Sequence, residues 1–139
     1  MLWIILAILS AISAAFVAIF GKIGIGNVDS TLATTIRAVV MAFVLLATSF
    51  SLGKFKLLST INSRALLFII LSGLAGALSW FFYFYALKIG PATGVAALDR
   101  LSVVFVLILA ALFLGESLTL RSGIGAVLLA IGAVLMVIK

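Results

Sequence analysis

The sequence contains neither cysteine nor histidine, and it has only three acidic residues and one proline in 139 residues. Without cysteine, neither a disulfide framework nor a thiolate metal site can form. Without histidine, the usual switch near neutral pH and the commonest metal ligand are both lacking. The acids are not paired, and no nucleophile stands with a base. We therefore predict no enzyme activity, no metal site and no cofactor.

Apolar side chains are what the sequence has in excess. They make up 67% of the residues, whereas charged residues make up 9%, and the mean hydropathy is +1.55. Soluble domains are about 45–50% apolar and about 25% charged. The composition predicts an integral membrane protein whose main partner is the lipid bilayer. The net charge of +6 does not indicate nucleic acid, because the basic residues are single and stand where apolar segments end.

Five apolar segments are long enough to cross a bilayer, which takes about 20 residues. They are expected at residues 2–21, 31–52, 65–87, 92–114 and 119–138, which predicts an all-α bundle of five transmembrane helices. A cleaved signal peptide is the less favoured interpretation of the first segment, because no Lys or Arg precedes it and the apolar run continues to Phe20. Asp29 and Ser30 are both good candidates for the N-cap of the second helix. The basic connection 51–64 is expected to be a solvated loop.

Three charged residues fall inside the predicted spans. Asp99 and Arg100 interrupt the fourth segment after Pro91, and Arg37 lies about 10 Å into the second. Such charges are costly in a bilayer and need a partner or a water-filled cavity. Successive spans alternate direction, so Arg37 and Asp99 enter from the same side, which leads to the hypothesis of an ion pair between them. Snorkelling to the interface is an equally good interpretation of Arg37, and Arg100 is read as a mouth or snorkelling charge.

Aromatic and small residues give two further patterns. The aromatic run 80–85 is typical of an interfacial belt, and the alternative is a substrate-facing wall with Trp80 and Tyr83, joined by Ser79 and Ser10. The fifth segment carries small residues at helical spacing, which favours packing between helices or between subunits. These residues are Ser122, Gly125, Ala126, Ala130 and Gly132.

The segment ALKIGPATGVAALDRLSVVFVLILAALFLGESLT (86–119) and the later GAVLLAIGAVLMV (125–137) resemble the second half of an EamA domain. This domain is the unit of the drug/metabolite transporter superfamily. The segment STLATTIRAVVMAFVLL (30–46) resembles its second helix, with Arg37 at the family's arginine position. The resemblance covers nearly the whole chain, so residues 1–139 are expected to form one EamA-like domain. One domain of five helices looks like the bacterial and archaeal transporter subgroup.

The resemblance implies a homodimer of ten helices, in which helices 1–4 of each chain line a cavity and helix 5 is peripheral. It implies a secondary exporter of small metabolites or amphipathic compounds in the cytoplasmic membrane of a prokaryote. In a secondary transporter Asp99, the one acid expected deep in a span, would be the proton or cation site, and Arg37 and Arg100 would set the charge preference. A structural clamp between Asp99 and Arg37, with facilitated diffusion elsewhere, is an equally good interpretation. Flanking bases are nearly equal on the two sides, which also permits an antiparallel dimer. The alternative function is a non-transporting accessory subunit that pairs with another EamA-like protein.

Overall fold

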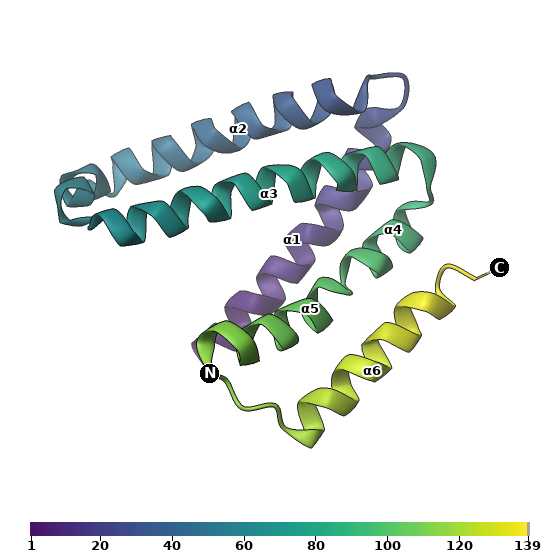
Figure 1. Cartoon of the computed structure of the whole chain (residues 1–139). Helices are drawn as coiled ribbons and strands as arrows, with labels where there is room; N and C mark the ends of the chain where they lie inside the picture. Colours follow the sequence, from purple (N-terminus) through teal and green to yellow (C-terminus); the bar gives the residue numbers. More distant parts are fainter. Residues whose placement is uncertain (139) are drawn as a thin grey trace. The chain divides into compact units, whose positions relative to one another are not determined.

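The computed structural model describes residues 1–138, and in this part of the chain every regular element is a helix (Figure 1). The all-α fold class is therefore confirmed. The elements are α1 (Leu2–Ile25), α2 (Ser30–Ser51), η1 (Lys54–Thr60), α3 (Ser63–Ile89), α4 (Ala92–Asp99), α5 (Ser102–Leu109), η2 (Ala110–Leu114) and α6 (Leu120–Leu135). The chain forms two compact units, which are described separately: residues 23–88, and residues 1–22 together with the chain from 89 onward.

Four apolar stretches in residues 1–138 are long enough to cross a membrane: α1, α2, α3 and the continuous stretch Ala92–Leu114. Their large apolar side chains stay exposed along the helices, as Phe43 (73%) and Leu112 (72%) show, which suits contact with lipid. The last helix, α6, has only 16 residues. It therefore spans about 24 Å, less than the roughly 30 Å of a hydrocarbon core.

In the unit of residues 23–88, α2 and α3 run in opposite directions (Figure 1). Helix α2 begins as predicted, because a side-chain oxygen of Asp29 accepts a hydrogen bond from Leu32 N at 3.0 Å. At the same end, the ammonium of Lys88 donates to Val28 O at 2.8 Å. This bond ties the end of α3 to the connection that precedes α2.

The connection between α2 and α3 is exposed, as expected, but it is helical instead of an irregular loop. Gly53 takes a left-handed conformation (φ 62°), which reverses the chain, and η1 then packs against α2. Phe55 lies in a groove beside Phe50 at the end of α2. The physical reason is the apolar content of the segment, because folding Phe55 back onto α2 shields it from water.

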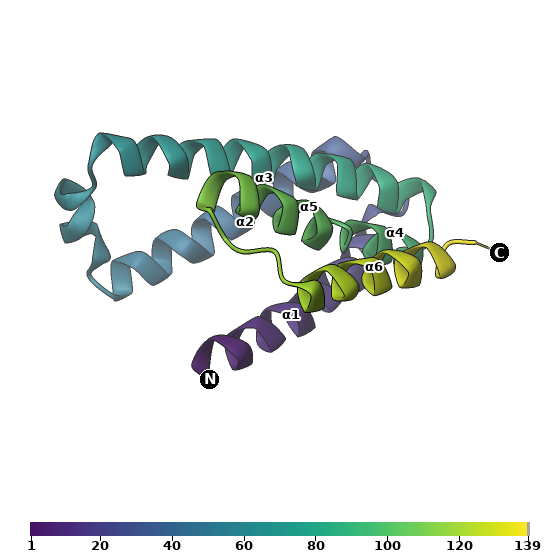
Figure 2. The same ribbon diagram turned by 60° about the horizontal axis from the view of Figure 1, so that its bottom comes forward.

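In the other unit, α6 packs along α4 and α5 (Figures 1 and 2). The contact is made by small residues, since Ala97 and Ala133 are buried and a Cβ at Gly94 would lie 3.5 Å from Val137. Small side chains let helix backbones approach closely where lipid offers no hydrophobic drive. The ammonium of Lys22, at the end of α1, donates to Gly90 O at 2.7 Å.

The predicted fourth helix is interrupted. The backbone N–H groups of Arg100 and Leu101 donate to the carbonyls three residues back, at 3.2 and 3.0 Å, and α5 begins only at Ser102. This tighter turn replaces the regular α-helical ladder directly after Asp99. The span expected at 92–114 is confirmed, and within it the hydrogen bonding changes from α4 through this turn to α5 and then to the wider turn η2. A sequence pattern that is apolar throughout does not predict such a change in hydrogen bonding.

Candidate functional site: a stacked arginine between two spans

The guanidinium of Arg37 lies over an aromatic ring inside the spans. Its Cζ atom is 3.5 Å from the centroid of the Trp80 ring and 5.5 Å from that of Phe84. Arg37 lies about 10 Å from the start of α2, and Trp80 about 13 Å from the end of α3. Both residues are therefore well inside the helices. A cation over a ring face is attracted by the ring's quadrupole, and this attraction strengthens where water is excluded.

The ring that supports Arg37 is itself held by neighbours on α3. Trp80 meets Tyr83 edge to face at 5.3 Å between centroids, and its ring lies 6.1 Å from that of Phe84. These three residues lie on adjacent turns, since positions three and four apart share a helix face. Phe84 is buried, whereas Arg37, Trp80 and Tyr83 are half-buried. The cluster therefore covers the guanidinium on the Trp80 side and leaves the rest of the Arg37 side chain partly exposed.

The charge of Arg37 is not balanced by an acid within its unit. Asp29 is the one acidic residue in the sequence 23–88, and it caps α2 through Leu32 N. A guanidinium carries five N–H donors in its plane, and stacking occupies only its face. The donors at its edge are therefore available to an anionic or carbonyl oxygen in the plane of the group. This arrangement is suited to binding the charged end of a small molecule.

Asp99 and Arg100 lie in the other unit, so the predicted ion pair between Arg37 and Asp99 stays a prediction. Asp99 is the last residue of α4, and Arg100 follows in the break before α5. Both side chains are exposed in the isolated chain. The irregular backbone places the carboxyl of Asp99 beside a turn instead of in a continuous helix. Asp99 therefore stands where the helical hydrogen bonding tightens for one turn.

The two serines of the predicted lining fall in different units. Ser79 is exposed on α3, one residue before Trp80, and Ser10 is exposed in the middle of α1. Ser79 and Tyr83 are four residues apart and share a face of α3. Ser79 can therefore belong to the same surface as the aromatic cluster, whereas the place of Ser10 relative to that cluster stays a prediction.

The predicted packing residues of α6 divide between two faces. Ser122, Ala126 and Ala130 are half-buried on the side that leads to buried Ala133, where α6 meets α4 and α5. Gly125 and Gly132 are exposed on the remaining surface of the helix, and a Cβ at either would meet no atom within 4 Å. The first set therefore packs within the chain, and only the second is available to another chain.

Comparison with known proteins agrees with a transport role. Residues 1–138 match the EamA-like transporter family. The chain belongs to this family. It is also 45% identical over 136 residues to a Sinorhizobium protein described as "uncharacterized transporter in cobO 3'region", covering 98% of this chain and 96% of the relative. No solved structure matches the chain.

As an EamA-family protein, the chain is a multi-pass membrane protein of a transporter family, as the sequence resemblance predicted. The sequence identified Arg37, Trp80 and Tyr83 as candidate site residues but did not predict the contact between Arg37 and Trp80, and Phe84 was missed. A signal was present, because Phe84 is four residues after Trp80 and the two share a helix face. The register of α2 against α3, which brings Arg37 to Trp80, has no counterpart in the one-dimensional pattern.

Proposed function

We propose that this EamA-family protein is a secondary transporter that exports small metabolites or amphipathic compounds. The observation that carries the proposal is the stack of Arg37 on Trp80 between two membrane-spanning helices. An ionisable residue inside a span is costly, and such residues usually mark a substrate or ion path. No enzymatic chemistry is proposed, since the stack offers binding groups without a nucleophile or base.

In this proposal Arg37 binds the polar end of the substrate through the edge of its guanidinium. Trp80 and Tyr83 provide an apolar wall for the remainder of the molecule, and Ser79 and Ser10 contribute polar lining. Arg37 and Arg100 together disfavour cations in the path and favour anions or zwitterions, because like charges repel strongly where water is scarce. The stack holds Arg37 in one orientation, which reduces the entropy lost on binding.

Asp99 is proposed as the proton or cation site that couples transport to a gradient. It is the one acid within the apolar stretch Ala92–Leu114, and it stands at the break between α4 and α5. Uptake of a proton from one side and its release to the other would drive substrate in the opposite direction.

Transport of three labelled probes into proteoliposomes under a pH gradient tests this function. The probes are benzoate, phenylalanine and ethidium, which differ in charge. We expect Asp99→Asn to abolish the pH-driven component and Glu116→Gln, which removes an acid outside the helices, to leave it unchanged. Arg37→Gln should reduce benzoate transport more than ethidium transport. Full pH coupling in Asp99→Asn would remove the proposed role of that residue, and no flux of any probe above empty liposomes would count against transport of these classes.

The proposed working unit is a homodimer in the cytoplasmic membrane of a prokaryote, with a cavity between helices 1–4 of the two chains. Gly125 and Gly132 on the open surface of α6 support a chain-to-chain contact. Because the sequence has no cysteine, Gly125→Cys gives a single cross-linking site without background. Self-cross-links in native membranes would support the homodimer. A cross-link to a different EamA-like chain would instead identify an accessory half-transporter.

A further inference from the structure

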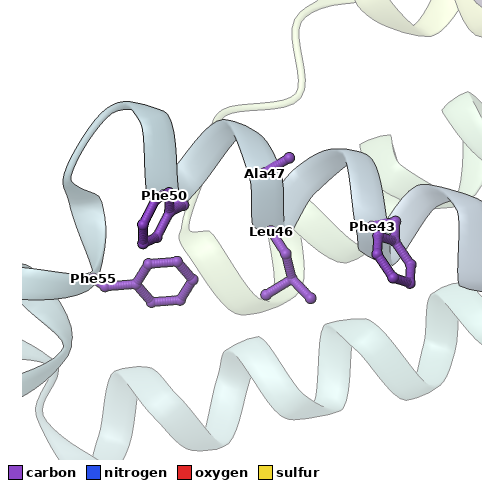
Figure 3. A pocket seen from close by; sticks show the side chains of 5 residues that line it. All are labelled: Phe43, Leu46, Ala47, Phe50 and Phe55. Carbon is purple, nitrogen blue, oxygen red and sulfur yellow. The ribbon is translucent and has the colours of Figure 1, made fainter.

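The folded-back connection η1 creates an apolar groove at the end of α2. The groove has a volume of about 320 Å³ and is lined by Phe43, Leu46, Ala47, Phe50 and Phe55. Figure 3 shows the Phe55 ring beside the Phe50 ring, with Leu46 and Phe43 further along α2. Every lining residue is apolar, so the groove offers no hydrogen bond to a ligand. Its occupant must be a hydrocarbon chain or an apolar side chain.

The groove lies open to its surroundings. Phe43 and Phe50 are 73% and 78% exposed, and Phe55 is 41% exposed. The groove stands at the last turns of α2, which is where a spanning helix leaves the hydrocarbon and meets the lipid headgroups. Lipid acyl chains are the hydrocarbon present at this level. A chain that lay along the groove would cover rings that are otherwise partly exposed to the interface.

Two lysines lie next to Phe55 of the groove in the sequence. Lys54 and Lys56 stand on either side of Phe55, and Arg64 follows at the start of α3. The sequence from 30 to 98 contains no acidic residue that could neutralise them. Lipid headgroups with a net negative charge are therefore the natural counterions at this surface, because basic residues next to a membrane are attracted to anionic lipids.

The lysines of η1 also differ from the lysines at the opposite ends of the helices. Lys22 and Lys88 each donate to a backbone carbonyl, at 2.7 and 2.8 Å. Within residues 23–88, Lys54 and Lys56 make no hydrogen bond or ion pair, and both are exposed. The ammonium groups of the first pair hold connections of the fold together, whereas those of the second pair are free to bind a phosphate.

We propose that the groove and the two lysines of η1 form a binding site for one anionic phospholipid. One acyl chain lies along Phe43, Leu46 and Phe50 and is closed at the end by Phe55, while Lys54 and Lys56 bind the phosphate. The chain in the groove gives the site its position, and the two charges give it preference for anionic over zwitterionic headgroups. The site also favours the orientation in which the η1 side of the protein faces the leaflet that is richer in anionic lipid.

Native mass spectrometry of the full chain, with phosphatidylglycerol and phosphatidylcholine in competition, tests the proposal. Each lysine near the surface favours anionic lipid by about 1 kcal/mol, which is about fivefold in affinity. We therefore expect one tightly retained phosphatidylglycerol, and an approximately 30-fold loss of its preference in K54Q/K56Q. The control Arg121→Gln removes an exposed charge from α6 and should change the preference less than twofold. Thermal melting verifies that each variant is folded, and the single variants K54Q and K56Q replace the double variant if it is not.

Three results would overturn the proposal. The first is equal retention of phosphatidylcholine by the unmodified chain, and the second is full preference for phosphatidylglycerol in the lysine variants. The third is efficient self-cross-linking of Phe50→Cys, which would identify a second copy of the chain as the occupant of the groove. Because none of these measurements depends on transport, the lipid site and the proposed transport function succeed or fail separately.

Discussion

The stack of Arg37 on Trp80 predicts a measurable coupling energy between two helices. A cation over a ring is worth about 0.5–1 kcal/mol when exposed and about 2 kcal/mol when desolvated. Arg37 is half-buried and its Cζ lies 3.5 Å from the Trp80 centroid, so we expect a value of about 1–2 kcal/mol. Removal of the indole alone costs more, because Trp80 also packs on Tyr83 and Phe84. Only the difference between variants isolates the stack.

A double-mutant cycle with Arg37→Gln and Trp80→Leu measures this difference. Each variant is unfolded in mixed detergent micelles by adding sodium dodecyl sulfate, and helix content is followed by circular dichroism. Coupling is the departure of the double variant from the sum of the single variants, and unconnected sites add to within about 0.3–0.5 kcal/mol. A cycle with Arg37→Gln and Phe43→Leu gives the matched control, because Phe43 lies on the same helix away from the cluster.

Fluorescence gives a second reading of the same contact. The sequence has two tryptophans, so Trp3→Phe leaves Trp80 as the sole reporter. Arg37→Gln should then shift its emission, whereas Arg121→Gln should leave it unchanged. A coupling energy no larger than the scatter of additivity, together with an unchanged Trp80 emission, would refute the reasoning from the stack. It would also remove the main support for the proposed substrate site.

Two further predictions concern the frame around the site. The pKa of Asp29 is lowered in the folded chain, chiefly by the backbone N–H of Leu32, so its contribution to stability is present above its unfolded pKa and is lost as pH falls through the folded value. Asp29→Ala should therefore lower the melting temperature at pH 7, whereas Asp29→Asn should largely preserve it. The loss of melting temperature in Asp29→Ala should become smaller below about pH 4. An equal loss at all pH values would contradict this reasoning. Gly94→Val should destabilise by about 1–3 kcal/mol in the detergent titration, because even a Cβ added at Gly94 would lie 3.3 Å from Cγ of Pro91. Gly73→Ala, with open space at its Cβ, should be neutral or stabilising by up to about 1 kcal/mol, and equal losses in the two variants would argue against the packing explanation.

The spans were predictable because the bilayer imposes one strong rule on the sequence. A run of about 20 apolar residues must be helical, since no other segment satisfies its own backbone in lipid. The start of α2 followed from Asp29, and the start of α4 from Pro91, because both residues act through local backbone chemistry. Features with a local cause were therefore found from the sequence alone.

The features that were missed depend on contacts between distant residues or on small changes of hydrogen bonding. The folding of Phe55 onto α2 was hidden by its neighbouring lysines, although its apolar ring was a usable signal. In the turn after Asp99, hydrogen bonds to the carbonyl three residues back replace the α-helical bonds to the carbonyl four residues back. No glycine or proline at this point indicates the change. The pairing of Arg37 with Trp80 needs the register of two helices, which hydropathy does not encode.

The stack changes the argument for how this EamA-family chain tolerates charge in its spans. On the sequence alone, Arg37 was read either as snorkelling to the interface or as pairing with Asp99 at similar depth. An aromatic face now accounts for part of the stabilisation of Arg37, and its own unit contributes no acid to it. The ion pair with Asp99 stays a prediction, because Asp99 belongs to the other unit. A structural clamp and the proposed coupling role for Asp99 therefore differ in what Asp99→Asn does: loss of a clamp lowers the stability of the fold, whereas loss of the coupling site removes pH-driven transport from a folded protein.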